Sequence, residues 1–361
     1  MVTASKYETL RFGFAALLFL FFMTINYVAN AENLKPIIKL EGSWKFSVGD
    51  DLSWANPDFN DRGWDLVGVP NTWENNGYKD YNGFAWYRKK FSLTSSNTQE
   101  EYVFLVLGYI DDVDEVYVNG HLVGASGTFP PLVKTAYQEL RKYPLPTEIL
   151  NTSGENVIAV RVYDEYMDGG IYAGPVGIYY DSDNALLTVN LSGYWDFETE
   201  KNTIKQETAM YGATTGKLFV PSNWESQGFP NYDGRATYNQ QFRVTSNMDI
   251  NDIFLVLGYI DDIDEVIFNG TKIGSVYNIR KKEPNTGWEY RVFRAYKLPP
   301  HLVNRNALNN ITVRVLDTGG LGGIYEGPVG LTTEANLKLL QERNVQKVES
   351  FWDFFNEFFF D

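Results

Sequence analysis

The sequence repeats itself at long range, and this repeat constrains the fold more than any other feature. The segment LVLGYIDDVDEV begins at Leu105, and LVLGYIDDIDEV begins at Leu255, about 150 residues later. A period of this length indicates tandem duplication of a whole domain rather than a short-period solenoid. We predict one domain at residues 38–182 and a second at residues 188–334. Further matching segments keep the same order, beginning at Leu40 and Leu191, Val69 and Val220, Arg141 and Arg294, and Ala159 and Thr312.

Each copy carries the signals of β-structure. The run EYVFLVLGYI reads as a buried strand, and DEVYVNGHLVG reads as a hairpin with a type I′ turn at Asn119-Gly120, matched by Asn269-Gly270 in the second copy. Short alternating segments elsewhere are separated by Gly, Pro and Asn turns, which is typical of β-sandwiches. The sequence therefore predicts an all-β protein with two tandem jelly-roll β-sandwiches, followed by a C-terminal helix.

The N-terminal residues have the pattern of an export signal. Lys6 and Arg11 precede the apolar run FGFAALLFLFFM, and Ala29 and Ala31 then supply the small-x-small arrangement that signal peptidase cleaves. We expect a signal peptide at residues 1–31 and a mature protein that is secreted, periplasmic or held at the cell envelope. The alternative is an uncleaved N-terminal membrane anchor, since the apolar run is about long enough to span if it tilts.

The C-terminal residues 335–361 have helical spacing and contain neither Gly nor Pro. Their phenylalanines fall on one face, at Phe351, Phe354, Phe355 and Phe358. We expect an aromatic helix that docks on the second domain. The alternatives are a helix that binds a partner, such as a separate hydrolase or an envelope protein, or one that lies on a membrane surface, which its acidic residues disfavour.

Composition excludes several functional classes. A formal charge of −15 argues against a nucleic-acid partner, because such proteins carry basic patches. The absence of cysteine excludes disulfides, thiolate metal sites and a thiol nucleophile. The only histidines, His121 and His301, do not occupy matching positions in the repeat, which disfavours histidine metal sites and a Ser-His-Asp triad.

The motifs taken together resemble a known group of modules. The order VPxxWExxG, YxGxAWYRxxF, LGxIDDxDEVYVNGxxVG, RxYxLP and NVIAVRV resembles the accessory β-sandwich of sialate O-acetylesterase-like hydrolases. It is similar, more loosely, to the sugar-binding domain of family 2 glycoside hydrolases of the β-galactosidase type. The resemblance implies two galactose-binding-like domains. The second copy departs from the pattern where Trp86-Tyr87-Arg88 becomes Thr237-Tyr238-Asn239, which puts the roles of Trp86 and Arg88 in doubt there.

The catalytic parts of those enzymes have no counterpart in the motifs. The sequence contains neither a Gly-Asp-Ser motif nor a Gly-x-Ser-x-Gly elbow. The residues outside the repeats are too few for a catalytic barrel, which needs about 200 residues or more. The resemblance thus implies accessory modules without their enzyme, and we assign no catalytic residue.

The acidic stretch is the first candidate site. Four carboxylates within five residues repel one another and need cations, N–H donors or guanidinium groups nearby. The functional interpretation is a site at a strand end for sugar hydroxyls or for a structural calcium ion, which prefers oxygen ligands, although the spacing is not that of an EF-hand. The alternative is structural, with the carboxylates accepting N–H bonds and pairing with Arg161 or Arg314. The stretch comprises Asp111, Asp112, Asp114 and Glu115, and its copy comprises Asp261, Asp262, Asp264 and Glu265.

Aromatic residues beside carboxylates are the second candidate. An indole can stack on a sugar ring while a neighbouring glutamate accepts hydroxyls. The alternative is a core tryptophan with a glutamate that caps a turn. In the segments GGIYAGPVG at Gly169 and GGIYEGPVG at Gly322, Tyr172 and Tyr325 could project into a groove, and the alternative there is a bulged closing strand. We also expect Asp164 and Asp317 to approach the acidic stretches. The complete candidate set for ligand binding is Trp73, Glu74, Tyr81, Trp86, Asp111, Asp112, Asp164, Tyr172, Trp224, Glu225, Tyr232, Asp261, Asp262, Asp317 and Tyr325.

These observations favour an exported, non-catalytic protein that binds a poly- or oligosaccharide through two linked modules, with avidity from the second contact. No cofactor is expected apart from the structural calcium ion considered above. The first alternative is a hydrolase that acts on O-glycosyl or O-acetyl sugars. The second is a structural module for protein–protein contact.

Overall fold

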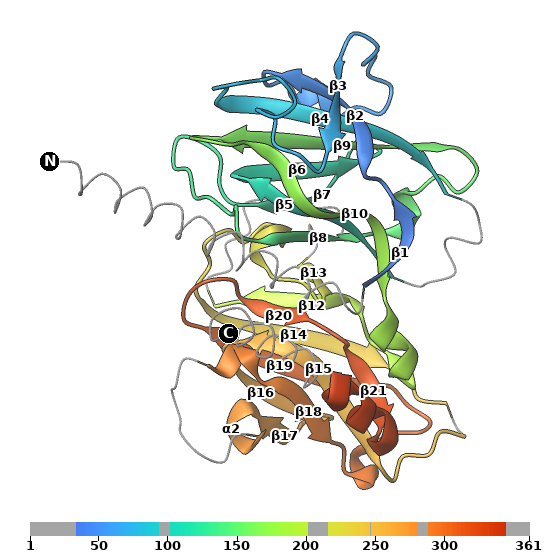
Figure 1. Ribbon diagram of the computed structural model, residues 1–361. Helices are drawn as coiled ribbons and strands as arrows, with labels where there is room; N and C mark the ends of the chain where they lie inside the picture. Colours follow the sequence, from blue (N-terminus) through green and yellow to red (C-terminus); the bar gives the residue numbers. More distant parts are fainter. Residues whose placement is uncertain (1–33, 94–101, 201–215, 246, 280–287, 344–361) are drawn as a thin grey trace, which may run out of the picture.

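The computed structural model describes residues 34–93, 102–200, 216–245, 247–279 and 288–343. The expected signal peptide at 1–31 and the phenylalanines of the C-terminal segment lie outside these residues. The described chain consists mainly of antiparallel β-strands arranged in sheets that pack face to face (Figure 1). The prediction of an all-β fold of sandwiches with a C-terminal helix is confirmed.

The first half of the chain forms a sandwich of two sheets. One has the order β1-β10-β5-β8, and the other has the order β3-β2-β4-β9-β6-β7. Side chains from both sheets share one core, which includes Phe46, Tyr87, Leu105 and Ile171. The strands are β1 (Leu34–Lys39), β2 (Gly42–Val48), β3 (Asp65–Val69), β4 (Gly83–Ser92), β5 (Val103–Asp111), β6 (Val113–Val118), β7 (His121–Ser126), β8 (Leu140–Leu145), β9 (Glu155–Asp164) and β10 (Gly170–Asp181).

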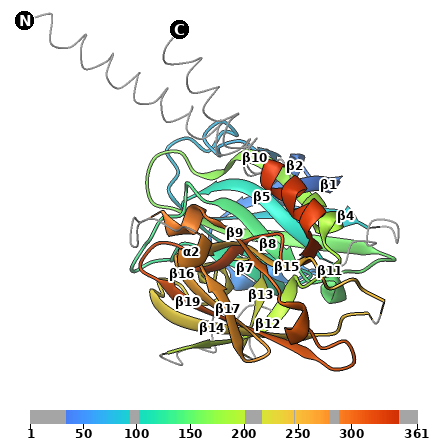
Figure 2. The ribbon, with the colours of Figure 1, turned by 90° about the horizontal axis from the view of Figure 1, so that it is seen from below.

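The second half repeats this arrangement. One sheet has the order β11-β21-β15-β18, with β20 also paired to β15, and the other has the order β13-β12-β14-β19-β16-β17. Figure 2 shows the short helix α2 (Val276–Ile279) beside β16 and β17. The strands are β11 (Val189–Asn190), β12 (Gly193–Thr199), β13 (Lys217–Val220), β14 (Gly234–Phe242), β15 (Ile253–Asp261), β16 (Ile263–Phe268), β17 (Thr271–Ser275), β18 (Phe293–Lys297), β19 (Asn309–Asp317), β20 (Gly323–Glu326) and β21 (Gly330–Thr333).

Strand β5 explains why its sequence is a continuous apolar run. Successive side chains of a strand point to opposite faces, and here both faces are covered. Leu105 lies in the core of the first sandwich, whereas Phe104 belongs to a separate cluster that includes Phe219 of the second half. The rings of Phe104 and Phe219 are 6.0 Å apart, and Tyr194 packs on Phe219 at 5.5 Å. This aromatic cluster joins the two halves.

The repeated motif also fixes local backbone geometry. Gly108 and Gly258 have φ values of +63° and +58°, and each lies beside a β-bulge. A Cβ atom at either glycine would lie 2.0 Å from a backbone carbonyl oxygen of the adjacent strand, so only glycine fits. The predicted Asn-Gly hairpin turns are confirmed, since Asn119 and Gly120 both have positive φ and connect β6 to β7.

The C-terminal helix begins after β21 and covers residues 334–343 of the described chain. Leu337 and Leu340 are buried, and the Asn336 side chain donates a 3.0 Å hydrogen bond to the Leu186 carbonyl. Arg343 pairs with Asp183. The described part of this helix therefore docks on the protein itself. Within the residues that the structure describes, no helix is long and apolar enough to cross a membrane.

Candidate functional site

The acidic stretch of the first half forms a cluster with a residue from a distant strand. Asp111 ends β5, Asp112 follows it, and Asp164 ends β9. Carboxylate oxygens of the three residues lie within 4.8 Å of one another. The expected approach of Asp164 to the acidic stretch is therefore confirmed, and it arises because β5 and β9 end at the same edge of the sandwich.

The second half contains the same cluster, built from Asp261, Asp262 and Asp317, again within 4.8 Å. Asp261 ends β15 and Asp317 ends β19, so the positions correspond to those of the first half. The Asp111–Asp112 and Asp261–Asp262 peptide bonds are both cis. We call these two groups the Asp111 cluster and the Asp261 cluster.

One carboxylate in each cluster is buried without adequate partners. Asp164 is 0% exposed, and neither of its carboxylate oxygens accepts a hydrogen bond of ordinary geometry. Asp317 is 2% exposed; its Oδ1 accepts a 2.9 Å bond from the Gly319 N–H, but its Oδ2 has no partner. Burying an ionised carboxylate without compensation costs several kcal/mol or more, so each cluster needs a counter-charge or a proton.

The raised pKa values of the aspartates reflect this lack of hydrogen-bond partners and counter-charges. Burial, together with the hydrogen bond and the charge of Asp112, raises the pKa of Asp111 to about 8. Burial and the Asp112 charge raise the pKa of Asp164 to about 7. Burial raises the pKa of Asp261 to about 9 and that of Asp317 to about 6. Each cluster therefore holds protons near neutral pH unless a cation replaces them.

The middle carboxylate of each cluster is oriented by hydrogen bonds. The Glu165 N–H donates to Asp112 Oδ2 at 3.0 Å, and the Thr135 hydroxyl donates to Oδ1. In the second half, the Thr318 N–H donates to Asp262 Oδ2 at 3.1 Å. Although burial acts in the opposite direction, hydrogen bonds from Asp261 and Thr318 lower the pKa of Asp262. The donors Thr135, Glu165 and Thr318 are distant in the sequence from the aspartates that they contact, and they belong to no recognisable motif, so the sequence did not identify them.

The rest of the acidic stretch is structural. Glu115 pairs with Arg161 at 3.0 Å, and Glu265 pairs with Arg314 at 2.9 Å, as the structural alternative predicts. Asp114 faces inward, where Arg141 donates from Nε to its Oδ1 at 2.6 Å and both side chains are fully buried. The matching pair in the second half is Asp264 and Arg294, at 3.0 Å. These two buried arginines were not predicted as partners.

The tryptophans are core residues, which corrects their assignment to a sugar-stacking surface. Trp73, Trp86 and Trp224 are 0% exposed, so their rings cannot reach a ligand. The glutamates beside them hold loops instead: Glu74 Oε2 accepts the Gly169 N–H at 3.1 Å. Likewise, Glu225 Oε2 accepts the Gly322 N–H at 3.0 Å.

The candidate tyrosines are half-buried, and their hydroxyls bond to the protein. Tyr172 and Tyr325 donate to the carbonyls of Tyr137 and Tyr290, both at 2.9 Å. Tyr81 and Tyr232 donate at 2.7 Å to backbone carbonyls three residues further along the chain. The tyrosines therefore hold loops in place, and Tyr81 and Tyr232 pack on Trp73 and Trp224 with ring centroids 5.5 and 5.4 Å apart. The two aspartate clusters are the candidate residues whose carboxylates the structure brings together.

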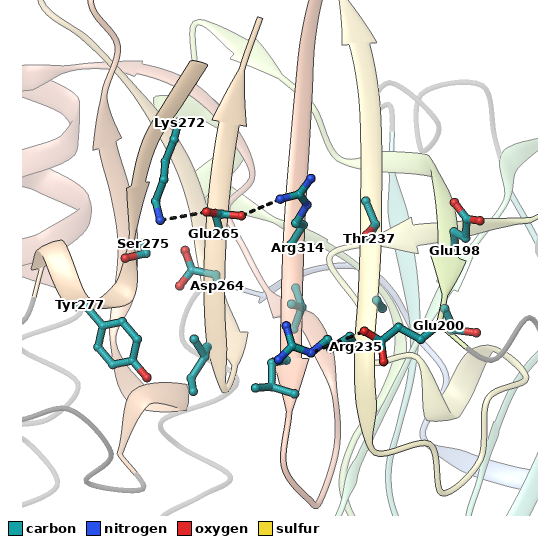
Figure 3. A pocket seen from close by; sticks show the side chains of 15 residues that line it. Glu198, Glu200, Arg235, Thr237, Asp264, Glu265, Lys272, Ser275, Tyr277 and Arg314 are labelled. Carbon is teal, nitrogen blue, oxygen red and sulfur yellow. Dashed lines mark hydrogen bonds and ion pairs between the residues drawn. The ribbon is translucent and has the colours of Figure 1, made fainter. Parts of the chain in front are cut away.

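A groove that the sequence did not predict lies on the outer face of the β13-β12-β14-β19-β16-β17 sheet (Figure 3). Its volume is about 810 Å³. Arg314 stands in register with Thr237 on one side and Glu265 on the other. The polar and charged residues that border it are Glu198, Thr199, Glu200, Arg235, Thr237, Asp264, Glu265, Lys272, Ser275, Tyr277 and Arg314, of which Asp264 directs its carboxylate inward to Arg294.

The first half covers the equivalent sheet face with aromatic residues. Trp86, at the position equivalent to Thr237, packs with Trp54 at 6.1 Å and with Tyr117 at 5.9 Å. Arg88 is buried there and pairs with Asp61 at 2.9 Å. The replacement of Trp86 by threonine in the second copy was the signal in the sequence that could have located the groove.

Comparison with known proteins agrees with this architecture. A protein-family model described as "Beta-galactosidase second all-beta domain" matches residues 49–168. A β-galactosidase of Bacteroides ovatus is 26% identical over 190 residues, which cover 48% of this chain and 21% of the relative. This chain thus spans about a fifth of the length of that curated relative.

The solved structures that resemble this chain also match it over only part of their own length. A Bacteroides uniformis β-glucuronidase is 17% identical with a TM-score of 0.35, covering 78% of this chain and 28% of its own. A glycosyl hydrolase family 2 member from Bacteroides cellulosilyticus is 14% identical with a TM-score of 0.34, covering 77% and 31%. The predicted resemblance to a β-sandwich accessory domain of family 2 glycoside hydrolases is confirmed by the family match.

Proposed function

We propose that this chain is an exported, non-catalytic carbohydrate-binding protein, and that the groove of the second half binds an oligosaccharide. The observation that carries the proposal is a groove that the described residues form over one sheet face of the second half, whereas Trp54, Trp86 and Tyr117 fill the equivalent face of the first half. The counterpart of Trp54 in the repeat falls within residues 201–215, which lie outside the described part of the chain. The match to an accessory domain of a β-galactosidase supports a role in sugar recognition rather than in catalysis.

The chemistry of the groove suits sugar hydroxyls. A hydroxyl both donates and accepts hydrogen bonds, so its site needs both kinds of group. Glu265 accepts from Arg314 and Lys272, each at 2.9 Å, and this row of paired charges offers spare donors and acceptors along the groove (Figure 3). Arg235 and Glu200 form a second pair at 3.5 Å. Tyr277, which is 40% exposed, offers a ring for contact with a sugar face.

The charge of the groove favours a neutral ligand. The basic groups Arg235, Lys272 and Arg314 are matched by the acidic groups Glu198, Glu200 and Glu265 around the rim. A groove of this composition has no strong preference for a sugar carboxylate or for an ammonium group. We therefore expect neutral hexose units rather than uronic acids.

Affinity electrophoresis of the full chain through gels containing neutral and acidic polysaccharides tests the proposal. We expect retardation by a neutral polysaccharide that is lost in Tyr277→Ala and Arg314→Ala. Lys297→Ala is the control, because Lys297 forms an exposed 2.9 Å pair with Asp252 and does not line the groove.

Two results would count against the proposal. Retardation that persists in a Tyr277→Ala, Arg314→Ala double variant would exclude the groove as the binding site, and absence of retardation in every gel would reject carbohydrate binding. Hydrolysis of nitrophenyl glycosides or acetates by the repurified chain would contradict its non-catalytic character.

A further inference from the structure

We infer that each half of the chain binds one calcium ion, the first in the Asp111 cluster and the second in the Asp261 cluster. The three carboxylates of each cluster would supply the ligands, with Asp111, Asp112 and Asp164 in one and Asp261, Asp262 and Asp317 in the other. None of these six aspartates lines the groove, and the inference does not depend on carbohydrate binding.

The buried aspartate distinguishes these clusters from ordinary acidic surface. Asp164 is 0% exposed, neither of its carboxylate oxygens accepts a hydrogen bond of ordinary geometry, and a carboxylate oxygen of Asp164 lies within 4.8 Å of those of the other two aspartates. Asp317 repeats this placement with one unpartnered oxygen. A buried carboxylate needs a counter-charge or a proton, and the buried guanidinium of Arg141 already pairs with Asp114 and donates to backbone carbonyls.

The ligand set selects the kind of cation. Both clusters offer carboxylate oxygens and no histidine, which favours a hard cation over zinc or copper. Calcium accepts irregular sets of six to eight oxygens, whereas magnesium demands near-ideal octahedral geometry and gives up its waters reluctantly. Three carboxylates drawn from two strand ends fit the less demanding ion.

The middle aspartate is positioned in advance of binding. Asp112 is held by the Glu165 N–H at 3.0 Å and by Thr135, and Asp262 is held by the Thr318 N–H at 3.1 Å. Each hydrogen bond uses one lone pair of a carboxylate oxygen and leaves another for a metal. A bound ion would tie the end of β5 to the end of β9, and the end of β15 to the end of β19.

A proton is the competing occupant. In the absence of metal, Asp111 shares a hydrogen bond with Asp112, so a proton on this pair can take the place of the cation in balancing the carboxylate charge. Experiments can distinguish the two occupants, because only the bound cation makes stability depend on added calcium, and its binding requires the carboxylate charge of Asp164 and Asp317.

Calorimetric titration of CaCl₂ into the EDTA-treated full chain at pH 8 tests the inference. We expect two sites per chain, one lost in Asp164→Asn and the other lost in Asp317→Asn. Glu155→Gln, which removes an exposed carboxylate paired only with Lys90, is the control and should retain both. MgCl₂ should bind at least tenfold more weakly, and tighter binding of magnesium would overturn the choice of calcium.

Thermal unfolding provides a second readout that needs no variant. Millimolar CaCl₂ should raise the melting temperature of the wild-type chain, and Asp164→Asn, which has the same shape without the charge, should raise it in EDTA and reduce the calcium response. Absence of both heat and a melting shift in folded wild-type protein would overturn the inference and leave the proton as the occupant. Unchanged binding in the Asp164→Asn, Asp317→Asn double variant would also overturn it.

Discussion

Replacing Arg141 by methionine would remove the cation that faces the fully buried Asp114. The guanidinium donates from Nε to Asp114 Oδ1 at 2.6 Å, and its other N–H groups donate to the carbonyls of Glu139 at 2.7 Å, Ile110 at 2.8 Å and Asp112 at 3.1 Å, as well as to that of Ala136. Methionine keeps much of the side-chain volume and supplies none of these donors.

The expected cost follows from burial. Burial already raises the pKa of Asp114, and the Arg141 charge opposes that effect. Removing one partner of a buried pair leaves an uncompensated charge and typically costs about 3–5 kcal/mol. The Tyr143 hydroxyl, which donates to Asp114 Oδ2 at 2.6 Å, remains and limits the loss. An exposed pair is worth only about 0–1 kcal/mol, so Lys90→Met, which breaks the exposed pair with Glu155, should have little effect.

Urea denaturation in EDTA, followed by circular dichroism, measures both variants without a contribution from metal. Arg141→Met should lower the free energy of unfolding by about 3–5 kcal/mol, and the loss should shrink at low pH, where Asp114 becomes neutral. The Asp114→Leu, Arg141→Met double variant should lose less than the sum of the single losses. A loss below about 1 kcal/mol for Arg141→Met, equal to that of Lys90→Met, would refute the reasoning.

Three further predictions use matched variants and the same urea assay. Burial raises the pKa of Asp111 to about 8 in the folded state, whereas the unfolded chain releases this proton near pH 4. In EDTA, the free energy of unfolding of the wild type relative to Asp111→Asn should therefore fall as the pH rises from about 4 to about 8, and an increase over this range would contradict the assignment. Gly108→Ala should cost at least about 1–3 kcal/mol because its Cβ would lie 2.0 Å from a carbonyl oxygen at positive φ, whereas Gly63→Ala meets nothing within 4 Å; equal losses would argue against the clash. Leu340→Ala, at 0% exposure, should cost about 2–5 kcal/mol and Leu339→Ala, at 45%, under about 0.5, and a reversed order would show that the helix does not dock as described.

The sequence predicted the features that depend on local pattern. The Asn119-Gly120 turn was predictable because few residue pairs tolerate two successive positive φ angles. The β-sandwiches followed from short alternating strands, and the approach of Asp164 to Asp111 followed from placing each at a strand end.

The functions of individual side chains were harder to predict, because the same letters serve packing and recognition. The sequence of a Trp-Glu pair is the same whether the indole stacks on a sugar or fills a core, and the structure places Trp73 in the core. The partner of Asp114 could not be found from sequence spacing, because Arg141 lies on β8 of the opposite sheet and the two side chains meet only in the folded sandwich. The groove was harder to predict because Trp86 is replaced by Thr237 in the second copy, and the effect of this replacement becomes visible only when the described residues of the two sheet faces are compared.

The aromatic cluster between the halves joins two different surfaces. Phe104 comes from β5 of the first half, whereas Phe219 and Tyr194 come from β13 and β12 of the second. The positions equivalent to Phe219 and Tyr194 in the first half are Gly68 and Ser43. The duplicated units are thus stacked head to tail without a two-fold axis, and the leading unit lacks the rings that would receive another one. In the first half, therefore, the positions that would meet a Phe104 side chain from a further copy carry no aromatic ring.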